Sequence, residues 1–128
     1  MEHQGETTRS ITALLVEDNP MIAMDIEDIL LAHGIEKVRL ATTLEDADHH
    51  LTETIDLAVL DFTLGSDTTE NLALRMQELG IPFLFVSGFA EKLSLQQALK
   101  ETPIVVKPFQ PEDLMAAINA LLFQLRET

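Results

Sequence analysis

Acidic, hydroxyl and amine side chains stand at the ends of four short apolar runs in this chain. Glu17 and Asp18 follow the first run, and Asp61 follows the second. Ser87 follows the third run, and Lys107 follows the fourth. Together these residues offer three carboxylates, one hydroxyl and one ammonium. If they meet in space, they can form a divalent-metal site with a nucleophilic aspartate, Asp61, at its centre.

The apolar runs predict the strands of a parallel sheet that is covered on both faces. Each run is three or four residues long, and stretches with helical periodicity separate the runs. The runs are residues 13–16, 57–60, 83–86 and 104–106. In an open α/β sheet the ligand site lies beyond the carboxyl ends of the strands, so parallel pairing gathers all five side chains on one rim.

The remaining elements complete a chain in which strand and helix alternate five times, which is typical of a wound α/β domain. Asn19 is suited to cap the first helix, Pro20 to its first position and Gly34 to its end. Thr42 or Thr43 is suited to cap the second helix. We predict an extra strand at 38–41 and helices at about 20–33, 44–54, from the 62–67 loop to 79, near 92–100 and from 111 onward.

The composition of the chain indicates one domain and narrows the classes of partner. Its 128 residues suit a single core, with a flexible arm over 1–10 and a domain over 11–127. There is no cysteine, so disulfides, thiolate metal sites and cysteine nucleophiles are excluded. A net charge of −14 repels nucleic-acid phosphates and suits a metal cation or a basic protein surface. No stretch is apolar over a membrane-spanning length, so we expect a cytoplasmic protein without membrane insertion.

Each site residue also has a plainer interpretation when it is taken alone. The pair Glu17 and Asp18 can be a loop with a helix cap. Ser87 can be a turn residue, and Lys107 can be an exposed strand end. Asp61 is harder to explain in this way, because an ionised acid after four apolar residues is expensive unless water or a cation meets it. The combination therefore carries more weight than any of its members.

That combination resembles the response-regulator receiver domain of two-component signalling. The matching pieces are the acid pair at 17–18, Asp61, Ser87 and the Lys-Pro-Phe segment at 107–109. The resemblance covers about residues 11–125. It implies a flavodoxin-like (βα)5 three-layer sandwich with a five-stranded parallel sheet in the order 2-1-3-4-5. It also implies a cis peptide bond before the proline of the Lys-Pro-Phe segment.

The resemblance further implies how a metal ion would be held. Glu17, Asp18 and Asp61 would bind Mg²⁺ together with the backbone carbonyl of Thr63, a set of oxygen donors that leaves room for water. Asp61 would also be the nucleophile that takes a phosphoryl group as an acyl phosphate. Because neighbouring carboxylates repel one another in the absence of the metal, we expect at least one of them to have a raised pKa.

Two further residues would act on the transferred group. Lys107 would place its ammonium beside the phosphoryl oxygens. Ser87 would donate a hydrogen bond to the group and be drawn inward, which biases a bistable loop. The phosphoryl donor would be a sensor histidine kinase. Because the chain stops after its last helix, we expect output through a protein contact, a phosphate-sink effect or relay to a phosphotransferase, and no enzymatic turnover.

The chain departs from the common receiver pattern at its aromatic residues. Many receivers carry Tyr or Phe three residues before the lysine, where this chain has Ile104, and the chain contains no tyrosine. The segment 82–89 instead resembles the FATGUY subgroup, many of whose members are single-domain regulators in bacterial stress signalling.

Other apolar residues receive structural interpretations. Phe83 and Phe85 are expected to pack in the core. Phe89 and Phe109 either cap the core edge, or one of them covers the site or forms part of a partner surface with the last helix. The apolar face of the last helix is expected to pack mainly in the core, with a shared dimer face as the alternative.

Three other functions stay open on the residues alone. A Mg²⁺-dependent phosphatase with an aspartyl intermediate would need an acid two residues after Asp61, where Thr63 cannot act as a general acid. A flavin or nucleotide module on this fold would need a phosphate-cradling loop after the first strand, where the acids at 17–18 would repel phosphate. The third is a degenerate receiver that binds its partner without phosphorylation, against which the intact residue set argues.

Overall fold

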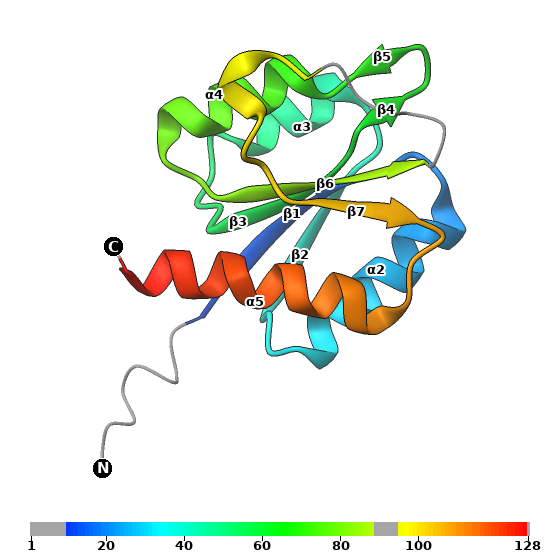
Figure 1. Cartoon of the computed structure of the whole chain (residues 1–128), viewed down its shortest axis with the longest axis vertical. Helices are drawn as coiled ribbons and strands as arrows, with labels where there is room; N and C mark the ends of the chain where they lie inside the picture. Colours follow the sequence, from blue (N-terminus) through cyan, green and yellow to red (C-terminus); the bar gives the residue numbers. More distant parts are fainter. Residues whose placement is uncertain (1–9, 89–94, 128) are drawn as a thin grey trace.

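The main sheet has five parallel strands in the order β2-β1-β3-β6-β7 (Figure 1). The computed structural model of the chain describes residues 10–88 and 95–127. The strands of the sheet are β1 (Thr12–Val16), β2 (Lys37–Ala41), β3 (Leu57–Asp61), β6 (Phe83–Gly88) and β7 (Ile104–Lys107). Two short strands, β4 (Thr63–Leu64) and β5 (Asp67–Thr68), form a separate antiparallel hairpin. With the hairpin set aside, the order is the predicted 2-1-3-4-5, and the fold prediction is confirmed.

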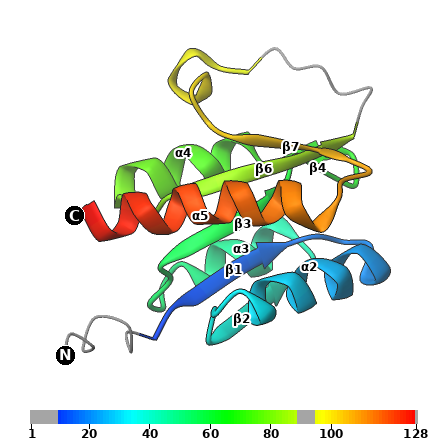
Figure 2. The ribbon, with the colours of Figure 1, turned by 60° about the horizontal axis from the view of Figure 1, so that its bottom comes forward.

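Helices cover both faces of the sheet. In the described part of the chain, α2 (Pro20–Ala32) and α5 (Pro111–Glu127) lie on one face, and α3 (Leu44–His50) and α4 (Glu70–Leu79) lie on the other (Figure 1 and Figure 2). Consecutive side chains of β1 lie on opposite faces of the sheet. Leu15 packs toward α2 and α5, whereas Leu14 packs toward α3 and α4. Both side chains are almost completely buried, as expected for an inner strand of a doubly covered parallel sheet.

Local signals set the ends of the helices. The Asn19 side chain accepts hydrogen bonds from two amides in the first turn of α2, and Pro20 takes the first helical position, as predicted. Of the two residues predicted to cap α3, Thr43 does so, and its hydroxyl accepts an amide hydrogen bond of 3.0 Å. α4 ends at Gly80, whose φ of 75° lies in the left-handed region that favours glycine.

The prediction of a second helix as far as residue 54 was wrong at its end. α3 stops at His50, and the amides of residues 51–53 bond to carbonyls three residues back, as in a turn. The hydroxyl of Thr52 donates to the carbonyl of His49 at 2.8 Å. Such a local side-chain bond offers the backbone an alternative to the helix, which explains the early end.

The helix predicted near 92–100 is not found over residues 95–100, where the structure has a single 3₁₀ turn, and residues 92–94 lie outside the described residues. The turn, η1, spans Gln97–Leu99. Gln96 before it has an extended backbone, with ψ of 149°, and an α-helix cannot run through that conformation. Leu95 and Leu99 both pack into the core layer of α3 and α4. The core contacts of these two side chains, and not a run of helical backbone hydrogen bonds, therefore hold this segment.

The predicted core positions of the phenylalanine pair and of α5 are confirmed. Phe83 and Phe85 are buried, with ring centroids 5.9 Å apart in an edge-to-face contact. Phe62 makes a similar contact with Phe85 at 5.3 Å. α5 contributes three side chains that are almost or fully buried, Leu114, Ile118 and Leu121. The alternative of a dimer face on α5 stays a prediction.

The division into an arm and a domain stays a prediction, since all but the last residue of the predicted 1–10 arm lies outside the described residues. Among the helices that the structure does describe, none combines the length and the apolar character that crossing a bilayer requires.

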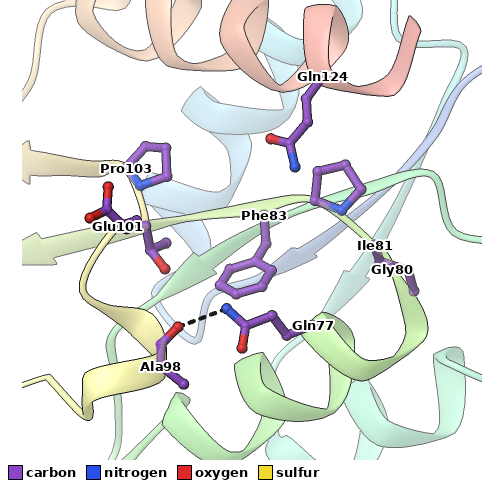
Figure 3. Close-up of a pocket in the computed structure, with 10 residues that line it drawn as sticks. Gln77, Gly80, Ile81, Phe83, Ala98, Glu101, Pro103 and Gln124 are labelled. Atoms are coloured by element: carbon purple, nitrogen blue, oxygen red, sulfur yellow. Dashed lines mark hydrogen bonds between the residues drawn. The ribbon is translucent and has the colours of Figure 1, made fainter. Parts of the chain in front are cut away.

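The amino end of the sheet carries a hollow of about 340 Å³ (Figure 3). It is lined by the stretches that lead into β6 and β7, together with residues of α4 and α5. Phe83 and Gln124 line it, and Gln77 there donates a hydrogen bond of 2.8 Å to the carbonyl of Ala98. Glu101 is the one charged lining residue. This hollow lies at the opposite end of the strands from the predicted site.

Candidate functional site

The carboxyl ends of the parallel strands meet at one rim, and the predicted site residues lie there. Glu17 and Asp18 follow β1 directly, Asp61 ends β3 and Lys107 ends β7. Ser87 lies in β6, which pairs with β3 on one side and with β7 on the other. The parallel register therefore brings to one place residues that are far apart in the sequence.

Lys107 lies beside two buried carboxylates. Its Nζ is 3.3 Å from Oδ2 of Asp61 and 3.5 Å from Oε1 of Glu17. Glu17 is 1% exposed and Asp61 is 5% exposed, whereas the Lys107 side chain is 23% exposed. One ammonium thus faces two acids that are largely removed from water, so the charges at the centre of the site are incompletely balanced.

The pKa of Asp61 is raised from 3.8 to about 7. Burial is the largest cause, because it removes water from the ionised form, and the Glu17 carboxylate adds to the rise. The Lys107 ammonium acts in the opposite direction. The predicted raised pKa is therefore found at Asp61, although burial contributes more than the repulsion between carboxylates on which the prediction rested.

The carboxylates at the rim are arranged to hold a cation. Glu17, Asp18 and Asp61 each offer one oxygen, and these oxygens lie within 4.8 Å of one another. Oε1 of Glu17 is buried and accepts no hydrogen bond from any residue that the structure describes. Asp18 is exposed, which gives water access to the group. Mg²⁺ prefers oxygen donors and keeps several waters, so these residues fit it.

The fourth predicted ligand is the backbone carbonyl of Thr63. Thr63 begins β4, two residues beyond Asp61 in the chain. The part that its carbonyl would play in binding a metal stays a prediction.

Backbone amides hold both acids of the pair that follows β1. The amide of Asn19 donates to Oε2 of Glu17 at 3.1 Å. The amide of Gly65 donates to Oδ2 of Asp18 at 3.2 Å. Gly65 lies between β4 and β5 with φ of 63°, a left-handed conformation that suits glycine. The hairpin after Asp61 therefore contacts the acid pair after β1.

Ser87 and the segment after Lys107 are also described at this end of the sheet. Ser87 is 2% exposed, and its hydroxyl donates to the carbonyl of Gly88 at 3.2 Å. Its action on a phosphoryl group stays a prediction. The peptide bond of residues 107–108 is cis, as predicted. Phe109 is partly buried against the core layer of α2 and α5, which favours the core-edge interpretation, and Phe89 lies outside the described residues.

Two features near Asp61 were missed by the sequence patterns. The predicted loop over 62–67 contains the β4–β5 hairpin. Thr69, which follows the hairpin, is fully buried and donates a hydrogen bond of 2.9 Å from its hydroxyl to the carbonyl of Asp61. In the sequence Thr69 resembles an ordinary helix cap, so the only signal was a hydroxyl residue eight positions after the aspartate.

The chain matches known proteins over almost its whole length. A sequence model described as the response regulator receiver domain matches residues 13–119. The phyllosphere-induced regulator PhyR of Methylorubrum extorquens is 26% identical over 117 residues, which are 86% of this chain and 43% of that protein. The response regulator SaeR of Staphylococcus aureus is 28% identical over 123 residues, which are 91% of this chain and 53% of that protein. The chain therefore spans about half the length of these curated relatives.

Solved structures agree with these matches. SdrG from Sphingomonas melonis Fr1 is 31% identical, with a TM-score of 0.76 over 88% of this chain and 97% of that one. The receiver domain of PhyR from Erythrobacter litoralis is 27% identical, with a TM-score of 0.77 over 89% of this chain and 91% of that one.

Proposed function

Because this chain belongs to the response-regulator receiver domain family, we propose that it accepts a phosphoryl group on the carboxylate of Asp61. One observation carries the proposal. The Nζ of Lys107 lies 3.3 Å from Oδ2 of Asp61, at the place where three carboxylate oxygens come within 4.8 Å of one another. A carboxylate held beside a positive charge favours phosphoryl transfer, because the reaction depends on alignment and on neutralising charge.

We infer that the donor in the cell is the phosphohistidine of a sensor kinase, in which phosphorus is bound to nitrogen. One carboxylate oxygen of Asp61 forms the new P–O bond while the P–N bond breaks. The leaving imidazole keeps the electron pair of the broken bond and takes up a proton. Lys107 stabilises the negative oxygens of the group in transit, and the hydroxyl of Ser87 donates to the acyl phosphate that results.

Asp61 must be ionised to act as the nucleophile. Its pKa of about 7 means that much of the metal-free protein carries a proton there near neutral pH. Glu17, Asp18, Asp61 and the carbonyl of Thr63 would hold Mg²⁺, which supplies positive charge to the carboxylates and to the phosphoryl oxygens when it is bound. The acids of the rim therefore both bind the cation and depend on it for their reactivity.

We infer that the chain acts as a stoichiometric acceptor of the phosphoryl group and not as an enzyme. We propose that it acts as a single-domain regulator and passes the signal on through a protein contact, through relay to a phosphotransferase or as a phosphate sink. A similar solved structure, from Bartonella quintana, is described as the anti-anti-sigma factor PhyR, with 27% identity over 95% of this chain. The downstream partner of this chain would accordingly be a regulatory protein.

Incubation with a small phosphodonor and Mg²⁺, followed by measurement of the intact mass, tests this function. We expect one phosphoryl group per chain on the native protein and none on Asp61→Asn. Asp67→Asn, which changes an exposed acid of the nearby hairpin, is the matched control and should be modified like the native chain. An unmodified native chain that still binds a partner would favour a degenerate receiver, and sustained release of phosphate from simple esters would favour the phosphatase.

A further inference from the structure

We propose that Thr69 is a positioning residue for the phosphoacceptor. Its buried hydroxyl holds the peptide group that follows the Cα atom of Asp61 and so fixes the direction of the Asp61 side chain. The inference rests on the proposed function, because it explains how the nucleophile is held in line for transfer. Thr69 is not one of the predicted site residues. Its proposed role is separate from metal binding and from the contact between Asp61 and Lys107.

The peptide group between Asp61 and Phe62 is held from two sides. The carbonyl of Asp61 accepts the hydroxyl hydrogen bond of Thr69 at 2.9 Å. The amide of Phe62 donates to the carbonyl of Val86 in β6 at 2.8 Å. The first bond comes from the start of α4 and the second from the neighbouring strand. Rotation of this peptide would break both hydrogen bonds, so its plane is fixed at the exact point where β3 ends.

Thr69 is also tied to the next peptide along the chain. Its own amide donates to the carbonyl of Phe62 at 2.9 Å. Its carbonyl accepts the amide of Ala73 at 2.9 Å, which is the first hydrogen bond of α4. Because Thr69 is 0% exposed, water does not compete for these bonds. Thr69 thus joins the start of α4 to the carbonyls of Asp61 and Phe62.

The helix-capping pattern indicates that this use of the hydroxyl is particular to Thr69. Asn19 and Thr43 stand at the N-caps of α2 and α3, and both side chains accept hydrogen bonds from amides of their own helices. Thr69 stands at the N-cap of α4 but makes no such side-chain bond. Thr69 therefore forgoes the usual capping bond, and the first amide of α4, that of Glu70, donates to the hydroxyl of Thr68 at 3.4 Å instead. The hydroxyl of Thr69 serves the backbone of the residue that would react.

The geometry explains why the reaction would depend on this bond. The carboxylate of Asp61 must reach phosphorus in line while it stays 3.3 Å from the Nζ of Lys107. A change in the peptide plane at the end of β3 moves the Cα–Cβ bond of Asp61 and displaces its oxygens. Phosphoryl transfer is sensitive to such displacement, since a misplacement of about 1 Å can lower a rate by roughly a hundredfold.

The test compares Thr69→Val with Thr69→Ser and Thr43→Val. The valine keeps the shape of the side chain and removes the hydroxyl, and the serine keeps the hydroxyl. Thr43→Val removes the cap of α3 and serves as a control for lost stability away from the rim. The readouts are the rate of phosphorylation from a small phosphodonor at saturating Mg²⁺, per folded molecule, and the melting temperature.

We expect Thr69→Val to slow phosphorylation by about tenfold to a hundredfold and Thr69→Ser to stay within about threefold of the native rate. Thr43→Val should lower the melting temperature and leave the rate unchanged. If Thr69→Val fails to fold, Thr69→Ala and Thr69→Ser provide the comparison, because both lack the methyl group and only the serine keeps the hydroxyl. Equal rates in Thr69→Val and Thr43→Val, or in the Ala and Ser variants, would overturn the inference and leave the proposed function standing. A native protein that takes up no phosphoryl group would overturn the proposed function, and the inference with it.

Discussion

The two ends of the same parallel sheet differ in the way their charges are arranged. At the carboxyl ends, two almost fully buried acids face one ammonium, and a third acid lies beside them. At the amino ends, the hollow beside β6 and β7 is lined by apolar residues, amides and one charged residue (Figure 3). The ends share the same strands and the same core layers, so the difference does not come from the fold alone.

The comparison separates residues that stabilise the chain from residues that would make it reactive. Buried acids are expensive unless a partner or a cation compensates them, and the rim carries that unfavourable energy. The amino end carries no comparable cluster among the described residues. Substitutions at the two ends should therefore affect different properties, and measurements of both properties can break or sharpen the distinction.

Phe83→Ala should have the largest effect on stability. The ring is buried at the amino end and packs against Phe85, so its loss should lower the free energy of unfolding by about 3–5 kcal/mol. Phosphorylation per folded molecule should stay at the native rate. Urea unfolding and intact-mass kinetics measure the two quantities, and a fall in the rate per folded molecule would contradict the separation of the two ends.

Lys107→Met should have the next largest effect, this time on the reaction. Removal of the ammonium beside Asp61 should slow phosphorylation by about 10²–10³-fold, the usual cost of losing one preorganised charge-stabilising group. Lys100→Met, an exposed lysine just after η1, is the matched control and should react at the native rate. Similar rates for the two variants would show that charge near the rim does not govern the transfer.

The smallest effect concerns pH in the absence of metal. The pKa of Asp61 is about 7 in the folded chain and 3.8 as its ordinary value, so the folded state holds this proton more tightly. Its contribution to stability is complete below about pH 4 and is lost as the pH rises through about 7. We expect the free energy of unfolding in EDTA to fall by about 2 kcal/mol over that range, below the limit of about 4 kcal/mol that such a pKa difference allows. The loss should be absent in Asp61→Asn.

Mg²⁺ provides the control for this pH dependence. A bound cation favours ionised carboxylates, so saturating Mg²⁺ should weaken or reverse the fall in stability and raise the melting temperature. The double substitution Glu17→Gln, Asp18→Asn should remove that rise. A rise that survives the double substitution would place the cation elsewhere.

The sequence was sufficient to locate the rim because its signals are local. Asp61 follows four apolar residues and Lys107 follows three, and short apolar strands that alternate with helices favour a parallel sheet. Parallel pairing then fixes which ends meet, without any knowledge of side-chain contacts. The order of the strands and the clustering of the acids around Asp61 were therefore accessible from the pattern together with the family resemblance.

The contacts of Thr69 were not accessible in this way. A threonine before a helix predicts a cap, and only the folded position of β3 shows that its hydroxyl meets the carbonyl of Asp61 instead. The early end of α3 has a similar origin, because the hydroxyl of Thr52 bonds to the carbonyl of His49 at the point where the helix was predicted to continue. Helix and turn propensities indicate which backbone conformations are available to a segment. Hydrogen bonds like those of the Thr69 and Thr52 hydroxyls then determine which of these conformations is adopted.

Lys107, which carries the positive charge of the site, lies at the end of an edge strand of the sheet. β7 has four residues and, within the described residues, pairs with β6 alone. Local opening at this edge breaks fewer backbone hydrogen bonds than opening of β1 or β3, which have neighbours on both sides. Opening of this kind would move Lys107 away from Glu17 and Asp61, whose strands keep their pairing, so the site would lose its positive charge while the rest of the sheet stayed folded.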